Sequence, residues 1–167
     1  MSHPLVLALF EDASLAAGAA RVVHELGITG DRLSVVAASH EDEGVLARVL
    51  DASPGVEIED SRLAARFGEL SARVLAAVAV VLPGIGPIVA AGPLAAEFGE
   101  AAGHVAGRVS AVLRDAGVEE ARAVAWQERI ACGAVLLGAH VHTGNPDEIA
   151  RAFEQHGAVD TAQARWA

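Results

Sequence analysis

Apolar and polar positions fall into distinct blocks near the start of the chain. Residues 4–10 form a short apolar run, polar residues follow at 11, 12 and 14, and an alanine-rich stretch covers 15–26. Short apolar runs bounded by polar residues are typical of buried strands, and polar residues before a longer periodic stretch are typical of helix N-caps. Gly27 is placed to end this helix, and Gly30 and Asp31 turn the chain into a second apolar run at 33–38. The pattern predicts a strand, a helix and a strand.

The far end of the chain repeats this order. A β-type run covers 134–141, Asn145 and Pro146 are typical of an N-cap and a first helical position, and 147–156 follow as a short helix. Gly157 is placed to end that helix, and 158–162 form a short final strand. Two strand–helix–strand units with right-handed crossovers make up a ferredoxin-like sheet. We therefore expect an α+β fold with a four-stranded ferredoxin-like sheet, built from halves at about 3–40 and 133–163.

The middle of the chain, about 60–132, is predicted to be a helical insertion. Apolar residues recur with helical spacing over 62–82, and the accompanying polar stripe ends after three turns. The segment Pro83-Gly84-Ile85-Gly86-Pro87 must reverse the chain, because two prolines and two glycines cannot continue a helix. Residues 74–96 carry no charge. The sequence thus predicts a Gly/Ala-rich helical hairpin with an apolar tip, inserted between strands 2 and 3 of a single domain, 1–167.

A stripe of small residues runs along both predicted arms and has the spacing of a glycine zipper. A glycine inside a helix costs about 1 kcal/mol relative to alanine, so close helix packing is the expected compensation. Either the two arms pack on each other, or the stripe joins copies of the chain. Because the apolar tip cannot face the chain's own sheet on every side, we expect a homo-oligomer. The expected interface residues are Val78, Val81, Leu82, Pro83, Ile85, Pro87, Ile88, Val89, Gly99, Gly103 and Gly107.

Charge and composition narrow the classes of function. The 167 residues carry 22 acidic and 12 basic side chains, a formal net charge of −10. A nucleic-acid surface would need a basic patch, so we expect no nucleic acid as a partner. The single cysteine, Cys132, excludes an intrachain disulfide framework and multi-cysteine metal sites. With no secretory signal pattern at the start, we expect a cytoplasmic protein, and membrane association through the apolar hairpin stays open.

Three histidines form the first group that could carry chemistry. His140 and His142 are two apart on a predicted strand and therefore share a face. An antiparallel first strand would bring His3 close to His142, and paired imidazoles can bind a metal. No carboxylate accompanies these histidines in the pattern. We therefore expect a solvated strand end and no metal site.

Cys132 belongs to the second group. The expected topology gathers it near His40, His156 and the acids at 11, 12, 41 and 42. A cysteine with a histidine and a carboxylate is the minimum for an activated thiol, but a free cysteine is commonly a small buried hydrophobe. The glycines at 84 and 86 are followed by no basic residue, so they form no nucleotide-binding loop. We expect no catalytic residue and no cofactor.

Several segments together resemble a known family. They are residues 5–12, residues 27–37 and, most specifically, Leu82-Pro83-Gly84-Ile85-Gly86-Pro87-Ile88-Val89-Ala90-Ala91-Gly92-Pro93-Leu94-Ala95-Ala96. With the similar segments 117–121 and 132–137, this pattern resembles the heat-induced general stress protein family of the YflT type. The resemblance implies a role in bacterial general stress responses and supplies no catalytic residues. Cys132 departs from the family pattern, in which a second glycine or an Arg–Gly pair often stands there.

The function expected from these observations is non-enzymatic. We expect a bacterial stress-associated protein that acts through self-association or through its apolar helical hairpin. One alternative is a peripheral membrane or apolar-ligand-binding protein whose hairpin inserts into lipid. A more distant alternative is a metal- or thiol-dependent enzyme.

Overall fold

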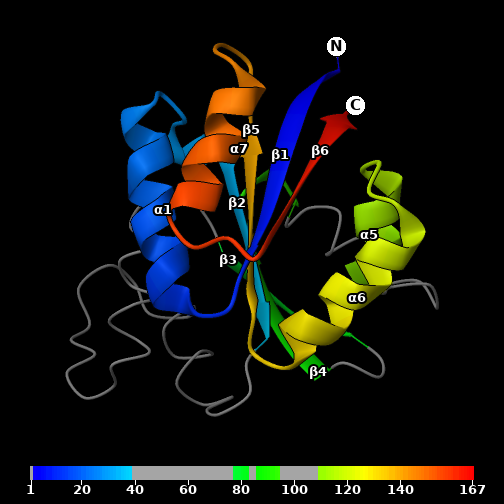
Figure 1. The fold of residues 1–167 in the computed structure, drawn as a ribbon. Helices are drawn as coiled ribbons and strands as arrows, with labels where there is room; N and C mark the ends of the chain where they lie inside the picture. The colour runs from blue at the N-terminus through cyan, green and yellow to red at the C-terminus, as the bar shows by residue number, and fades with distance from the viewer. Residues whose placement is uncertain (1, 39–76, 83–85, 95–108) are drawn as a thin grey trace.

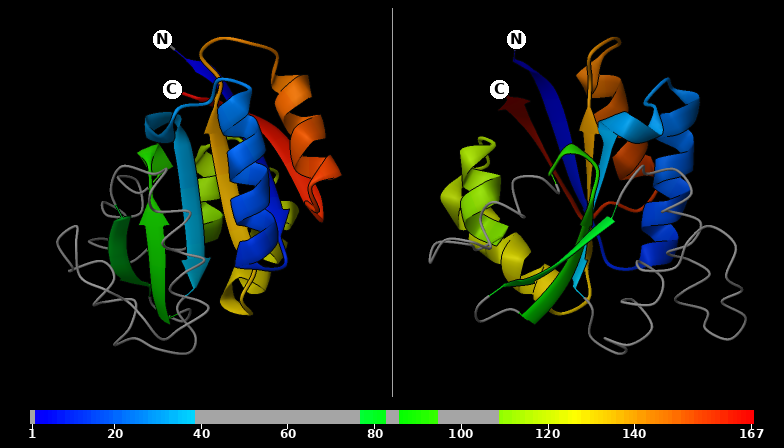
Figure 2. Two further views of the ribbon diagram at one scale, coloured as in Figure 1. Left: turned by 90° about the vertical axis from the view of Figure 1, so that its left-hand side faces the viewer. Right: turned by 180° about the vertical axis from the view of Figure 1, so that it is seen from behind.

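The fold is a single antiparallel sheet with helices on both faces (Figure 1). The computed structural model describes residues 2–38, 77–82, 86–94 and 109–167. Six strands pair in the order β3-β4-β2-β5-β1-β6, and every pairing is antiparallel. Figure 2 shows α1 and α7 on one face of the sheet and α5 and α6 on the other. The α+β class expected from the sequence is confirmed.

The elements follow one another along the chain in a simple order. They are β1 (His3–Phe10), α1 (Ala13–Glu25), the short 3-10 helix η1 (Gly30–Arg32), β2 (Leu33–Ala38), β3 (Ala77–Leu82), β4 (Gly86–Ala91), α5 (Val109–Asp115), α6 (Glu120–Ala131), β5 (Val135–His140), α7 (Pro146–Gln155) and β6 (Asp160–Trp166).

Capping residues set the starts of two helices as the sequence predicts. The Asp12 side chain accepts a hydrogen bond from the Leu15 N–H, which satisfies one of the free donors at the start of α1. Asn145 does the same for the Asp147 N–H, with Pro146 at the first position of α7. The final strand lies later than the predicted 158–162. At this sheet edge polar and apolar residues alternate, so the strand continues beyond the short run on which the prediction rested.

The predicted helical hairpin is wrong over its tip. Residues 77–82 and 86–91 form strands β3 and β4, which pair from Ala77↔Ala91 to Leu82↔Gly86. The expected reversal between 82 and 86 is present. β-branched side chains lose rotamer freedom in a helix and fit a pleated sheet, and β4 also gains pairing with the β2 backbone.

The expected interface residues are therefore divided. Those on the two strands are Val78, Val81, Leu82, Pro87, Ile88 and Val89. Those outside the described residues are Pro83, Ile85, Gly99, Gly103 and Gly107, and the first predicted arm over 62–76 also lies outside them. The second predicted arm begins with β4, is helical at residues 93 and 94, and is helical again at α5, with 95–108 outside the described residues.

Alternate residues of the strands build two separate cores. Val6, Ala8 and Phe10 face α1 and α7, where the Phe10 and Phe153 rings meet edge to face with centroids 5.9 Å apart. Leu5, Leu7 and Leu9 face the other way, toward α5 and α6. Because helices cover both faces, β1 is apolar at every position from 5 to 10.

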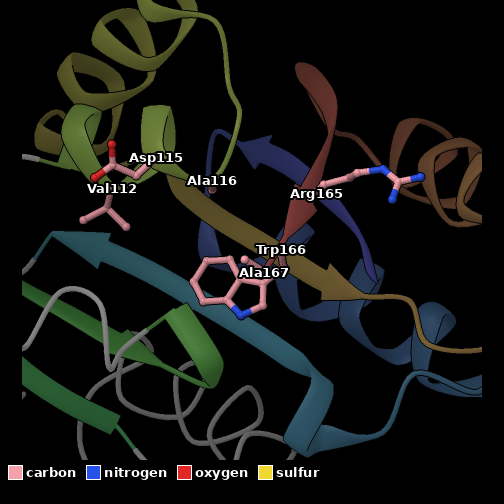
Figure 3. A pocket seen from close by; sticks show the side chains of 6 residues that line it. All are labelled: Val112, Asp115, Ala116, Arg165, Trp166 and Ala167. Carbon is pink, nitrogen blue, oxygen red and sulfur yellow. The ribbon is translucent and has the colours of Figure 1, made fainter. Parts of the chain in front are cut away.

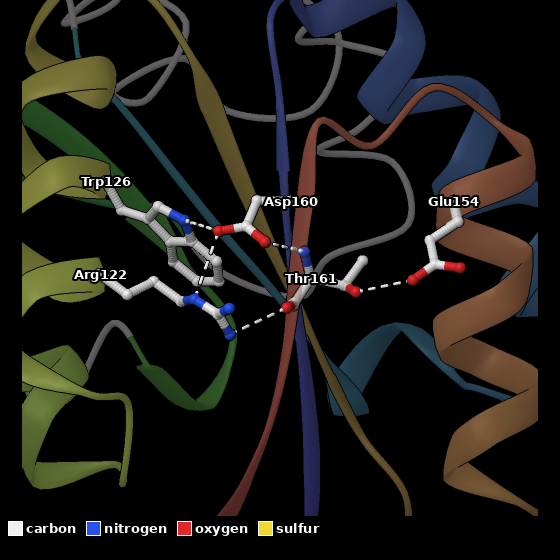
Figure 4. Close-up of polar contacts among 5 residues, drawn as sticks. All are labelled: Arg122, Trp126, Glu154, Asp160 and Thr161. Carbon is white, nitrogen blue, oxygen red and sulfur yellow. Dashed lines mark hydrogen bonds and ion pairs between the residues drawn. The ribbon is translucent and has the colours of Figure 1, made fainter.

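Polar contacts tie helices on both faces to the edge strand β6 (Figure 4). The buried Trp126 of α6 donates its indole Nε1–H to Asp160 Oδ2 at 2.8 Å, and Arg122 Nε lies 3.4 Å from the same oxygen. Thr161 donates its N–H to Asp160 Oδ1, accepts at its carbonyl from Arg122, and donates its hydroxyl to Glu154 of α7. Side chains therefore occupy the backbone groups of Thr161 at the sheet edge, where they oppose pairing with another strand.

Candidate functional site

Three histidines meet at one end of the sheet. His3 is the first residue of β1, His140 is the last residue of β5, and the antiparallel register places Leu5 opposite His140. The rings of His3 and His142 stack with centroids 4.0 Å apart, and His3 Nε2 lies 3.0 Å from His140 Nδ1. The predicted approach of His3 to the other two histidines is confirmed. The expected solvated strand end is wrong for His140, which is 1 % exposed because Ser34, His3 and Trp166 surround its ring.

A buried serine lies on the other side of His140. Ser34 of β2 and His140 are 0 % and 1 % exposed, and Ser34 Oγ lies 3.1 Å from His140 Nε2. The Leu94 N–H donates to the same Oγ at 3.0 Å. The indole of Trp166 in β6 meets the His140 ring edge to face at 5.2 Å. The site therefore joins β1, β2, β5, β6 and the segment after β4.

That segment, residues 92–94, crosses β2 in close contact, and we name it the strap. Gly92 has φ +82°, and a Cβ built on it would lie 2.1 Å from the Leu33 carbonyl oxygen. Only glycine fits there. The Leu94 side chain is fully buried over Gly138 of β5, where an added Cβ would lie 3.1 Å from a Leu94 methyl carbon. Two glycines thus allow the strap to dock on the sheet.

Sequence reasoning missed Ser34, Trp166 and the strap as parts of this site. The available signals were a single serine inside the apolar run 33–38 and a glycine inside the apolar run 134–141. A lone polar residue in a buried strand needs a partner, and a strand glycine often marks a close approach. Neither signal names the partner, because the strap comes from a distant part of the sequence.

Burial keeps the central imidazole neutral. Burial, followed by the charges of His3 and His142, lowers the pKa of His140 from 6.5 to about 4. The pKa of His3 is also lowered, first by burial and then by His142, the amino terminus and Arg32. The unfolded chain therefore takes up a proton before the folded one as pH falls. The stability that neutral His140 contributes is complete above pH 6.5 and is lost between 6.5 and about 4.

The three histidines and Ser34 are poorly suited to bind a metal ion or a substrate. Among the described residues, no group of three or more His, Cys, Asp or Glu side chains has the geometry to hold a metal. Both ring nitrogens of His140 are already hydrogen-bonded, Nδ1 to His3 and Nε2 to Ser34. The Ser34 hydroxyl cannot meet a substrate, because the side chain is fully buried.

A small cavity is lined by Trp166, the residue whose ring contacts His140 (Figure 3). Its volume is about 220 Å³, with Val112 and Ala116 on the apolar side and the exposed Asp115 at the rim. Figure 3 shows the Arg165 side chain directed away from Trp166, so this guanidinium does not face the other lining side chains. The lining residues are Val112, Asp115, Ala116, Arg165, Trp166 and Ala167.

The second predicted group is brought together only in part, at Cys132 and Glu11. Cys132 is exposed at the end of α6 and lines a cavity of about 380 Å³ beside Glu11 and Arg129, whose side chains form an ion pair at 2.7 Å. His156 Nδ1 instead bonds to the Ala152 carbonyl at 2.7 Å. In the part of the chain that the structure describes, no histidine or carboxylate bonds to the Cys132 thiol. His40 and the acids at 41 and 42 lie outside that part.

Within the described residues, no helix has the length and apolar character needed to cross a membrane.

Comparison with known proteins identifies no family for this chain. No family model matches the chain, and neither the curated proteins nor the solved structures contain a match.

Proposed function

We propose that this chain is a non-enzymatic protein that acts by self-association through the β3–β4 hairpin. The observation that carries the proposal is the position of β3 at the end of the strand order among the described residues. Its six residues, Ala-Val-Ala-Val-Val-Leu, include no charge and no proline. In proteins that stay monomeric, edge strands usually contain charged residues or proline, which oppose pairing with another strand. A second copy of β3 is the occupant to which we commit, because an uncharged strand can pair antiparallel with its own copy.

The opposite edge supports the same choice. At β6, side chains of α6 and of β6 itself occupy the backbone groups of Thr161. Blocking one edge directs association to the other, so that pairing closes at a dimer rather than continuing into a fibre. The proposal therefore predicts a discrete assembly with the two β3 strands antiparallel.

The architecture around the hairpin also forms part of the proposal. We take β1-α1-β2 and β5-α7-β6 as a ferredoxin-like core, into which the hairpin, α5 and α6 are inserted. The order β2-β5-β1-β6 and the shared face of α1 and α7 support this interpretation. A stress-associated role in bacteria rests on the resemblance of segments 5–12, 27–37, 82–96, 117–121 and 132–137, and a cytoplasmic location rests on the single cysteine and the lack of a secretory signal pattern.

The test measures molar mass by light scattering in detergent-free buffer. We expect an oligomer for the unaltered chain. Val80→Lys places a charge in the middle of β3 and should weaken association by at least tenfold, since an edge charge opposes strand pairing. Val159→Lys is the matched control, because the Val159 side chain is 44 % exposed and the residue lies just before β6, at the other edge of the sheet from β3. It should leave the mass unchanged.

Two outcomes would overturn the proposal. One is a monodisperse monomer at micromolar concentration, and the other is an oligomer that Val80→Lys does not affect. The lipid alternative is tested in parallel by flotation with phosphatidylcholine vesicles. Binding to these vesicles that Val80→Lys abolishes, with a monomer in solution, would favour the lipid alternative.

A further inference from the structure

A chain of hydrogen bonds links four distant segments at the histidine end of the sheet. It runs from the Leu94 N–H to Ser34 Oγ, from Ser34 to His140 Nε2, and from His140 Nδ1 to His3 Nε2. The three distances are 3.0, 3.1 and 3.0 Å. We name this chain the relay. It connects the strap to the first residue of β1 through two fully buried side chains.

Counting protons gives the relay a direction. A serine hydroxyl has one proton and can accept two hydrogen bonds. Since Ser34 Oγ accepts from Leu94, its own proton is best used toward His140 Nε2. His140 then carries its single proton on Nδ1 and donates to His3 Nε2. The opposite tautomer would leave the buried Ser34 proton without an acceptor among the described residues, which is costly.

If either His3 or His140 takes up an additional proton, this order of donors and acceptors cannot be kept. A protonated His3 carries N–H groups on both nitrogens, so its Nε2–H would face the Nδ1–H of His140. A protonated His140 would direct its Nε2–H at the Ser34 hydroxyl proton and would place a charge in a site that is 1 % exposed. In both cases a donor faces a donor. The relay is satisfied at every link only while both imidazoles are neutral.

The surrounding charges do not compensate for such a proton. The positive groups that act on His3 are His142, the amino terminus and Arg32, and those on His140 are His3 and His142. Asp31 is the acidic group near His142, and it lies beside Arg32. Among the described residues, Ser34 and the Trp166 ring also contact His140, and neither carries a charge.

We infer that the relay is a proton-operated latch, in which proton uptake by the His3–His140 pair separates the two rings and releases both the start of β1 and the strap. In the closed state the Val141 N–H donates to the Pro4 carbonyl at 2.9 Å and the Leu94 N–H is bound to Ser34. In the open state both amides lose these acceptors. The latch is independent of the proposed self-association, because none of its residues lies in β3 or β4.

Amide hydrogen exchange measured by NMR at pH 7.5 and pH 5 tests the latch. A folded-state pKa of about 4 against 6.5 in the unfolded state gives roughly a 30-fold increase in local opening at pH 5. We expect the protection factors of the Leu94 and Val141 amides to fall by roughly that factor. The Val118 and Ala158 amides bond to the Leu113 and Phe153 carbonyls and not to the strap, to β1 or to a histidine, so they should change little and serve as internal controls.

Non-titrating variants assign the effect to the relay. His140→Gln keeps a donor and an acceptor but cannot gain a proton in this range, so the pH effect at Leu94 and Val141 should disappear. His140→Asn, which likewise cannot gain a proton, is the second variant if His140→Gln does not fold. His156→Gln is the matched control, because His156 bonds to Ala152 outside the cluster, and it should keep the full pH effect.

Either of two results would overturn the latch. In the first, Leu94 and Val141 lose no more protection at pH 5 than Val118 and Ala158. In the second, whichever of His140→Gln and His140→Asn folds retains the pH response of the unaltered chain.

Discussion

Alanine at position 92 should be far more damaging than alanine at most other glycines with positive φ. Gly92 has φ +82°, a conformation that costs an L-residue about 1–2 kcal/mol. The new Cβ would also lie 2.1 Å from the Leu33 oxygen and 2.8 Å from the Ser34 Cα, both of which are backbone atoms of a central strand. Neither atom can move without disturbing β2, so residues 92–94 must move away from β2.

Retreat of the strap removes two interactions. The Leu94–Ser34 hydrogen bond at 3.0 Å would stretch beyond bonding distance, a loss of about 1 kcal/mol. The fully buried Leu94 side chain would lose part of a contribution of about 1.5–3 kcal/mol. With the backbone cost, we expect Gly92→Ala to lower the free energy of unfolding by about 4 kcal/mol.

Urea denaturation at pH 7.5, followed by far-UV circular dichroism, measures this loss. Gly133→Ala is the matched control, because Gly133 has φ +105° and a Cβ added to it would meet no other atom within 4 Å. It should lose only the backbone term of about 1–2 kcal/mol. Equal losses for the two variants would refute the argument that the strap approaches the β2 backbone closely.

Two further predictions concern the edge strand and the histidines. Asp160→Ala leaves the Trp126 indole N–H, 2 % exposed, without its acceptor and should cost about 2 kcal/mol in the same assay. Asp160→Asn keeps one oxygen for the indole and loses the exposed ion pair with Arg122 and the acceptor of the Thr161 N–H, so it should cost less than Asp160→Ala, about 1 kcal/mol. Equal costs for the two variants would contradict this reasoning. Calorimetric titration with zinc at pH 7.5 should show no site tighter than roughly 1 μM, because both His140 nitrogens already have partners. Submicromolar binding at one equivalent that a His140→Ala, His142→Ala double variant abolishes would contradict this prediction.

Elements specified by local chemistry could be predicted from the sequence. Asp12 and Asn145 cap their helices as expected, and the apolar runs before and after them form the central strands. The meeting of His3 with His140 and His142 also followed from strand direction alone. The helix caps depend on residues close in sequence, and the approach of the histidines depends only on the antiparallel direction of β1 and β5.

Features that depend on distant partners could not be predicted. An apolar run such as 77–82 has no polar period, so spacing alone does not separate a strand from a buried helix. The pairing of β4 with β2 decides for the strand. Similarly, Ser34 is one serine in an apolar run until Leu94 and His140 are placed beside it.

The position of β1 has a consequence for the synthesis of the chain. Its two neighbours in the sheet are β5 and β6, which are translated more than a hundred residues later. At 5–20 residues per second, ribosomes take on the order of ten seconds to supply those partners. During that interval the six apolar residues from Leu5 to Phe10 have no strand to pair with. The nascent chain therefore leaves this apolar segment unpaired for that time, and assembly of the central sheet must wait until β5 and β6 have been translated.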